Sequence, residues 1–137
     1  MGTPFVLDAS VTLTWAFDDE HSVIADRAEA LLSAASAVAV VPELWWYEVR
    51  NILLVGERRK RITPEASASF LRQLANINAE VDSLKSEGHL LDICRRHHLT
   101  VYDAAYLALA MRRAIPLATL DRALEAAAIA EGIKIVA

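Results

Sequence analysis

Short apolar segments alternate with segments of helical periodicity along the whole chain. Each apolar segment is followed by a stretch in which apolar residues recur at the spacing of a helix with one buried face. Strands that are separated by helices pair in parallel, because a parallel neighbour can be reached only through a crossover connection. The sequence therefore predicts a three-layer α/β/α fold with a mainly parallel central sheet of four to five short strands.

The boundaries of the expected elements follow from this alternation and from residues that begin or end helices. Thr63 is expected to cap a helix, Pro42 and Pro64 to occupy first turns, and Gly132 to end the last helix. The expected strands are residues 5–8, 37–41, 99–103, 116–120 and 133–137, with residues 79–83 as a short strand or an extended link. The expected helices are residues 9–17, 22–36, 42–61, 62–77, 83–98, 104–113 and 122–130.

The length and composition fit a single domain, residues 1–137. A chain of 137 residues with 55% hydrophobic residues can bury one substantial core, and no Gly/Ser-rich linker divides it. The longest stretch without charged residues, residues 30–42, is too short to cross a bilayer, and the first residues lack the pattern of a secretory signal. We therefore expect a cytoplasmic protein without a membrane-spanning segment. The single cysteine, Cys94, excludes an internal disulfide.

Composition also excludes some classes of binding site. The four glycines are scattered at positions 2, 56, 88 and 132, so there is no Gly-rich loop for a dinucleotide or nucleotide phosphate. The net charge of −4 gives no global basic field for nucleic acid, but basic residues cluster at 56–62, 94–98 and 111–113. Each cluster is interpreted either as a solvated helix end or as a surface that follows a phosphate backbone.

Aspartate follows three of the expected strands. Asp8 comes after FVL, Asp103 after TVY and Asp121 after LATL. Each is suited to cap the next helix, but the carboxyl ends of parallel strands also share one edge of the sheet, where ligands bind in such folds. Carboxylates about 4 Å apart repel by roughly 4 kcal/mol near a protein surface, so a cluster of them requires a cation or protons. The sequence therefore predicts a site for a hard divalent ion.

A fourth candidate acid lies in the tryptophan-rich helix. Glu48 shares a helical stripe with Leu44, Ile52 and Val55, so its carboxylate points the way the core-facing side chains point. The alternative is a boundary residue whose head reaches water or pairs with Arg50. We include Glu48 in the predicted site.

Four motifs together resemble the PIN domains, and especially the VapC-type toxins of bacterial toxin–antitoxin pairs. The motifs are FVLDASVTLTWAFDDE, VPELWWYEVRNIL, VYDAAYLALA and ATLD, in the order of the family and spread over nearly the whole chain. The resemblance implies a PIN-like fold and an endoribonuclease in which four acids hold Mg²⁺ or Mn²⁺ and hydrolyse RNA. The matching acids here are Asp8, Glu48, Asp103 and Asp121.

The resemblance also implies residues that support these acids. Ser10 and Thr119 match hydroxyl positions beside the metal site, and Asn51 matches a polar supporting position. Some members of the family carry another Asp two residues after the last acid, where this chain has Ala123. Whether a complete second metal site exists therefore stays open.

The coordination chemistry of Mg²⁺ suggests which acids bind the ion and which orient water. Mg²⁺ keeps several waters and needs only one or two carboxylates in addition to substrate phosphate. We expect Asp8 and Asp103 to be the primary ligands, and Asp121 and Glu48 to orient water or to bind a second ion. Hydrolysis by water in line with the scissile bond would leave a 5′-phosphate and a 3′-hydroxyl.

The resemblance extends to partners. It implies an RNA substrate (tRNA, rRNA or mRNA), a small VapB-type antitoxin whose carboxyl-terminal segment covers the site, and a homodimer. The apolar residues of segment 44–55 are compatible with a dimer interface, although burial in the core explains them equally well.

Two other functions remain open from the sequence. One is a different Mg²⁺-dependent phosphoryl-transfer domain, such as a receiver or a phosphatase of the D-x-D type; here Asp8 is followed by Ala9 and Ser10, so the second Asp of that motif is missing. The other is a catalytically silent PIN-like module that only binds a partner. The presence of all four acids argues against the silent module.

Overall fold

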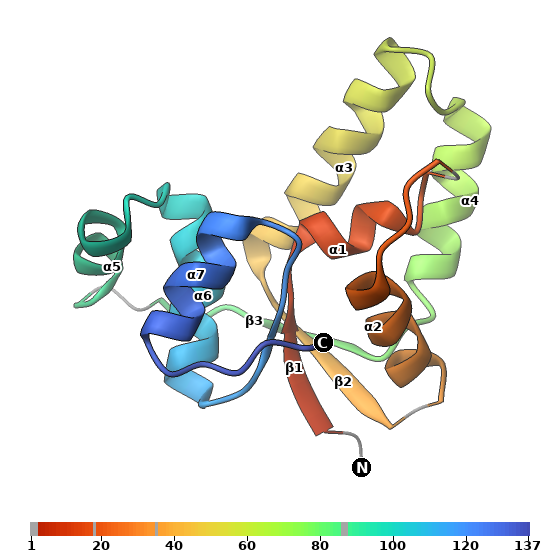
Figure 1. Ribbon diagram of the computed structural model, residues 1–137. Coiled ribbons are helices and arrows are strands. Elements are labelled where there is room, and N and C mark those ends of the chain that lie inside the picture. The colour runs from red at the N-terminus through yellow and green to blue at the C-terminus, as the bar shows by residue number, and fades with distance from the viewer. Residues whose placement is uncertain (1–2, 18, 35, 86–87) are drawn as a thin grey trace.

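The computed structural model describes residues 3–17, 19–34, 36–85 and 88–137, which form four strands and seven helices (Figure 1). Helices α5, α6 and α7 lie on one side of the sheet in this view, and α1 and α2 on the other. The elements in chain order are β1 (Thr3–Leu7), α1 (Ala9–Thr14), α2 (Val23–Ser33), β2 (Ala37–Pro42), α3 (Glu43–Arg58), α4 (Pro64–Leu74), β3 (Ala79–Asp82), α5 (Leu90–His97), α6 (Val101–Arg113), β4 (Leu117–Ala118) and α7 (Arg122–Ala130).

The sheet has the strand order β3-β2-β1-β4, and every pair of neighbouring strands is parallel. Thr3 pairs with Ala37 at the start of β1, and Leu7 pairs with Ala118 at its end. The strand ends therefore share one edge, as predicted. The prediction of a three-layer fold with four to five mainly parallel strands is confirmed, with four strands in the described residues.

The two central strands form the middle of the core. Val6 and Leu7 of β1 and Val40 and Val41 of β2 are fully buried. Their continuous apolar runs are explained by the helices on both sides of the sheet. Helix α6 packs against β1, β2 and β4, and α2 packs against β2 and β4.

Hydroxyl and carboxylate side chains begin several of the helices. The Thr63 hydroxyl accepts a hydrogen bond from the Ala66 N–H, which confirms the cap predicted for α4. Pro42 is the residue just before α3 and not part of its first turn. Helix α7 ends before Gly132, whose φ of 79° is left-handed backbone that glycine adopts without strain.

Three predicted elements differ from the structure. Residues 99–103 are not a strand, because Thr100 caps α6 and the helix already begins at Val101. The predicted last strand, residues 133–137, is reduced to a single bridge between Leu117 and Ile135. The helix predicted over residues 83–98 begins only at Leu90, and its residues 86–87 lie outside the described part.

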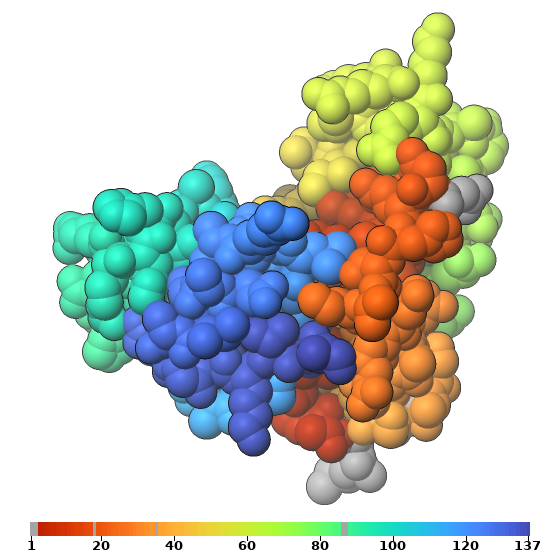
Figure 2. Space-filling model, in the orientation of Figure 1, coloured from red at the N-terminus to blue at the C-terminus, as the bar shows by residue number. Residues whose placement is uncertain are grey.

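Helices α3 and α4 form an antiparallel arm that projects from the sheet (Figure 1). The surface is hollowed between this arm and the part formed by α5, α6 and α7 (Figure 2). In the described ranges, no helix combines the length and the apolar character that a membrane crossing requires.

Candidate active site

Asp8 is a buried carboxylate directly after β1. It is only 5% exposed, and its Oδ2 accepts hydrogen bonds from the hydroxyls of Ser10 and Thr119, both at 2.7 Å. Its side chain makes no capping bond to α1, although its position is that of the N-cap. Burial raises the pKa of Asp8, the hydroxyls of Ser10 and Thr119 oppose the rise, and the charge of Asp121 adds to it.

The two hydroxyls also join the end of β1 to the end of β4. The Ser10 hydroxyl accepts a hydrogen bond from the Leu120 N–H at 2.9 Å, and the Thr119 hydroxyl accepts one from the Asp121 N–H at 3.0 Å. Thr119 is fully buried. The segment that carries Asp121 is therefore fixed to the residues that hold Asp8.

Asp121 is the N-cap of α7, as the sequence suggested. Its Oδ1 accepts a hydrogen bond from the Leu124 N–H at 2.9 Å, and the side chain is partly exposed. A carboxylate at this position also gains from the positive end of the helix dipole. Asp121 can therefore cap the helix and belong to the acidic site, because Oδ1 accepts the capping hydrogen bond and Oδ2 does not take part in it.

Asp103 reaches the same region by a different route from the one predicted. It lies in the first turn of α6, and its N–H donates to the Thr100 hydroxyl at 3.1 Å, so Thr100 and not Asp103 is the cap. Burial raises the pKa of Asp103, and the charges of Asp121 and Asp8 raise it further. The side chain is half-buried.

Glu48 enters from α3. It is half-buried, like Leu44, Ile52 and Val55 in the stripe that the sequence assigned to it. Its Oε1 accepts a hydrogen bond from the Tyr106 hydroxyl at 2.6 Å. Burial raises the pKa of Glu48, Tyr106 opposes the rise, and the charges of Asp8 and Asp103 add to it.

The four predicted acids therefore lie close enough to repel one another. They come from the end of β1, the middle of α3, the first turn of α6 and the start of α7, which are far apart in the sequence. Such mutual repulsion favours proton uptake or a bound cation. Without one of these, the cluster destabilises the folded protein.

The residues fit a hard divalent ion by the chemistry of their donors, which are carboxylate and hydroxyl oxygens. In the described ranges, however, no three Asp, Glu, His or Cys side chains are already arranged around one point as a complete binding cage. Oxygens of Asp8, Glu48 and Asp121 are held by hydroxyl or N–H donors of the protein. A bound ion would therefore use the carboxylate oxygens that these donors leave free, with water or phosphate completing its shell.

The resemblance implied a supporting position for Asn51. This residue is exposed on α3, and in the described part of the chain no hydrogen bond joins its side chain to any of the four acids. The base of α3 is instead supported by the indole N–H of Trp45, which donates to the Thr12 hydroxyl at 2.9 Å. Both of these side chains are buried.

Two structural features were not predicted from the sequence. Tyr106, which holds Glu48, lies three residues after Asp103, so its place in the motif VYDAAYLALA was the only available signal. Asp82 is a further aspartate at a strand end, and the rule that selected Asp8 and Asp121 applies to it equally.

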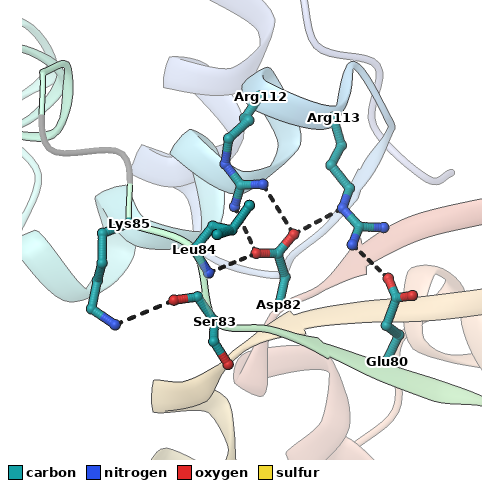
Figure 3. Close-up of polar contacts among 7 residues, drawn as sticks. All are labelled: Glu80, Asp82, Ser83, Leu84, Lys85, Arg112 and Arg113. Carbon is teal, nitrogen blue, oxygen red and sulfur yellow. Dashed lines mark hydrogen bonds and ion pairs between the residues drawn. The ribbon is translucent and has the colours of Figure 1, made fainter.

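The structure places Asp82 in a separate ion-pair cluster. Its two oxygens accept hydrogen bonds from Arg112 at 2.9 and 3.0 Å, one also accepts from Arg113 Nε at 2.9 Å, and the other from the Leu84 N–H at 3.0 Å (Figure 3). Arg113 also pairs with Glu80 at 2.6 Å. The arginines hold the pKa of Asp82 at about 2, so this carboxylate is already compensated by cations of the protein.

Other basic clusters also form internal ion pairs. Arg61 pairs with Asp19 and Glu20, while Arg96 and His97 both contact Glu131. All three clusters seen in the sequence therefore contribute at least one arginine to the fold.

Comparisons with known proteins agree with this architecture. The model of the PIN domain family matches residues 5–130. Ribonuclease VapC3 of Pyrobaculum aerophilum is 32% identical over 125 residues, which cover 87% of this chain and 90% of that protein. The crystal structure of PAE2754 from Pyrobaculum aerophilum superposes with a TM-score of 0.73 at 24% identity, covering 99% of this chain and 92% of the other.

A second solved structure is more distant in sequence. Mycobacterium tuberculosis VapC20, described as a toxin that cleaves the sarcin–ricin loop, superposes with a TM-score of 0.64 at 15% identity. The match covers 90% of this chain and 94% of VapC20. At this identity the similarity speaks for the fold.

Proposed function

Because the chain belongs to the PIN domain family, and within it to the VapC-type ribonucleases, we propose that it is an endoribonuclease toxin of a toxin–antitoxin pair. The reaction is hydrolysis of RNA phosphodiester bonds. The proposed catalytic acids are Asp8, Glu48, Asp103 and Asp121. One observation carries the proposal: the carboxylates of four distant segments meet, and the charges of neighbouring acids raise the pKa of Asp8, Glu48 and Asp103. Asp82, by contrast, is compensated by arginines.

The proposed cofactor is Mg²⁺ or Mn²⁺. When bound, such an ion acts as a Lewis acid that offsets the charge of the carboxylates and of the scissile phosphate. Asp8 and Asp103 are the proposed primary ligands. The hydroxyls of Ser10 and Thr119 fix one oxygen of Asp8 and leave its charge intact, since they are neutral donors. Ala123 offers no ligand on α7, so the proposal requires only one fully held ion.

Asp121 and Glu48 orient water in this proposal. Each has one oxygen engaged by the protein, with the Leu124 N–H and the Tyr106 hydroxyl respectively. A carboxylate fixed in this way can accept a hydrogen bond from the attacking water and position it. Attack in line with the leaving group leaves a 5′-phosphate and a 3′-hydroxyl on the cleaved strands.

The proposed partners are a VapB-type antitoxin and a second copy of this chain. Support for the homodimer comes from apolar side chains on the arm helix α3, where Trp46 is 47% and Tyr47 68% exposed. An apolar hollow of about 500 Å³ lies beside them, lined by Leu44, Leu84 and Leu90 among others. A single domain and a cytoplasmic location, where RNA and an antitoxin would be met, belong to the same proposal.

The experiment is cleavage of a mixed RNA panel by purified, antitoxin-free protein. The panel contains tRNA, a sarcin–ricin loop hairpin, other ribosomal RNA and an unstructured RNA, each with Mg²⁺, Mn²⁺ or EDTA. Metal-dependent cuts that carry 5′-phosphates are expected. Uptake of a phosphoryl group by Asp8 from a small donor, without RNA cleavage, would favour the phosphoryl-transfer alternative. Folded protein that cuts no RNA and binds no metal would favour the silent module.

A further inference from the structure

Tyr106 joins the two helices that carry acids of the site. It lies on α6 three residues after Asp103, its side chain is fully buried, and its hydroxyl donates to Glu48 on α3 at 2.6 Å. Tyr106 is also the largest of the fully buried side chains among the described residues. A residue of the core thus forms a hydrogen bond with an acid of the site.

A phenylalanine would fill the same space without a polar group. A buried hydroxyl carries a desolvation cost unless it has a hydrogen-bond partner, so a tyrosine in the core requires one. Glu48 is that partner. The hydrogen bond therefore restricts the orientation of the Glu48 carboxylate and also gives the buried Tyr106 hydroxyl its partner.

The chemical type of the donor matters for a cation site. Asp82 is held by guanidinium groups, which bring positive charge and compensate the carboxylate. Glu48 is held by the hydroxyl of a phenol, which is an uncharged donor at neutral pH. The negative charge of Glu48 is therefore available to a cation. Its other oxygen, Oε2, has no hydrogen-bond partner within the described ranges.

Without the hydrogen bond from Tyr106, the Glu48 side chain is expected to rotate away from the other acids. The charges of Asp8 and Asp103 repel it, and it is only half-buried, so its flexible side chain can rotate toward water. The net free energy of a hydrogen bond to a charged group is large enough to oppose this rotation.

We propose that Tyr106 is a positioning residue that keeps the Glu48 carboxylate directed toward the cation of the acidic site. The inference rests on the proposed function only for the presence of a divalent ion. Tyr106 itself contacts neither the ion nor the RNA in this scheme. Its effect passes through Glu48, with Oε1 fixed by the phenol and Oε2 left to the ion or to its water.

The test is a mutant cycle read out by Mn²⁺ binding in calorimetric titrations of the full chain, without RNA. Tyr106→Phe is expected to weaken Mn²⁺ binding about tenfold, the lower end of what loss of a residue behind a metal ligand costs. In a Glu48→Gln background, Tyr106→Phe is expected to have no further effect. Tyr102→Phe is the matched control, because Tyr102 lies on the same helix, is 64% exposed and makes no hydrogen bond in the described residues.

A second variant covers the case in which Tyr106→Phe does not fold. Glu48→Asp keeps the charge but withdraws it from the phenol, so it is expected to weaken Mn²⁺ binding to a similar extent. Wild-type affinity in Tyr106→Phe, or an equal loss in the presence and absence of Glu48, would overturn the inference and leave Tyr106 as core packing. Failure of the wild-type protein to bind Mn²⁺ would overturn it as well.

The proposed function can fail separately. If the wild-type protein binds Mn²⁺ and Tyr106→Phe weakens that binding through Glu48, the positioning role stands even if no RNA is cleaved. If RNA is cleaved with Mn²⁺ at the same apparent Mn²⁺ affinity in wild type and Tyr106→Phe, the function stands and the positioning role is overturned.

Discussion

The Asp8 carboxylate is held in the core by two hydroxyl groups. Ser10 and Thr119 both donate to its Oδ2, and both also accept a backbone N–H near Asp121. A hydroxyl can do this because it is a donor and an acceptor at once. Two small side chains therefore fix the spacing of two acids that repel each other.

Thr119→Val tests this arrangement, because valine keeps the shape and removes the hydroxyl. We expect the free energy of unfolding to fall by about 1–2 kcal/mol, since buried Asp8 loses one of its donors. RNA cleavage is expected to slow by roughly 10–100-fold, the range for residues behind metal ligands. Thr14→Val is the control, because the Thr14 hydroxyl bonds only to Val11 O within α1. Equal cleavage by Thr119→Val and wild type would remove Thr119 from the site.

Repulsion among the acids predicts a stability gain when one of them is neutralised. Burial and the charges of Asp121 and Asp8 raise the pKa of Asp103 above its unfolded value. A raised folded pKa means that the contribution to stability is complete below the unfolded pKa and is lost as pH rises through the folded pKa. Asp103→Asn should therefore raise the Tm in EDTA at pH 7.5, by about 3 °C for a change near 1 kcal/mol, and have little effect at pH 3.

Thermal unfolding in EDTA at the two pH values provides the check, with Asp92→Asn as control. Asp92 lies in the first turn of α5, as Asp103 does in α6, but it is exposed and next to Arg95. A lower Tm for Asp103→Asn at pH 7.5 would show that the carboxylate stabilises the metal-free fold.

Single residues of the site were predictable to different degrees. Asp8 and Asp121 follow buried strands, so the pattern of apolar runs located them. Asp103 was found for an incorrect local reason, since it follows a cap and not a strand. Tyr106 and its bond to Glu48 could not be derived, because the contact joins residues far apart in the sequence and periodicity carries no information on tertiary partners.

At the scale of elements, strand β3 depends on an ion-pair cluster. It is short and mostly exposed, yet its last residue, Asp82, is buried between Arg112 and Arg113 at the end of α6 (Figure 3). The cluster therefore ties the outer strand of the sheet to the helix that carries Asp103.

This cluster predicts a specific acid sensitivity. The pKa of Asp82 is about 2, below its unfolded value of 3.8, so its contribution to stability is present above the unfolded pKa and is lost as pH falls through about 2. The shift corresponds to roughly 2 kcal/mol at pH 7. Urea unfolding of wild type and Asp82→Asn should differ by at least this amount at pH 7 and converge near pH 2. A difference that does not change with pH would contradict the assignment.

The differences between the predicted and the observed elements have physical causes. Residues 99–103 look like a strand by composition, but the Thr100 hydroxyl accepts the Asp103 N–H and starts the helix earlier. The closing segment contains alternating apolar residues, yet only Ile135 forms a bridge to β4, which itself has only two residues. Propensity identified the central strands because burial on both faces makes them continuously apolar.

At the scale of the whole molecule, the acidic site and the proposed dimer surface lie on different parts of α3. Glu48 points to the site, whereas Tyr47, the adjacent residue, is 68% exposed beside an apolar hollow. Successive residues of a helix diverge by about 100°, so one helix serves both surfaces.

Tyr47→Glu tests the proposed homodimer. A charge in an apolar interface carries a desolvation cost, so this variant is expected to elute as a monomer in gel filtration at concentrations where wild type elutes as a dimer. Leu91→Glu on α5 makes a similar change at a residue that is 53% exposed and does not line the hollow. A wild-type protein that elutes as a monomer at every concentration would contradict the dimer.

The catalytic role of the acidic site is tested by the RNA cleavage rate of Asp103→Asn beside that of Asp92→Asn, with Mn²⁺ and with EDTA. Both changes remove one negative charge from the first turn of neighbouring helices, but only Asp103 belongs to the acidic site. We expect Asp92→Asn to cut RNA at the wild-type rate with Mn²⁺ and not with EDTA, while folded Asp103→Asn cuts at least about 100-fold more slowly. Undiminished cleavage by Asp103→Asn, or cleavage by wild type in EDTA, would contradict this role.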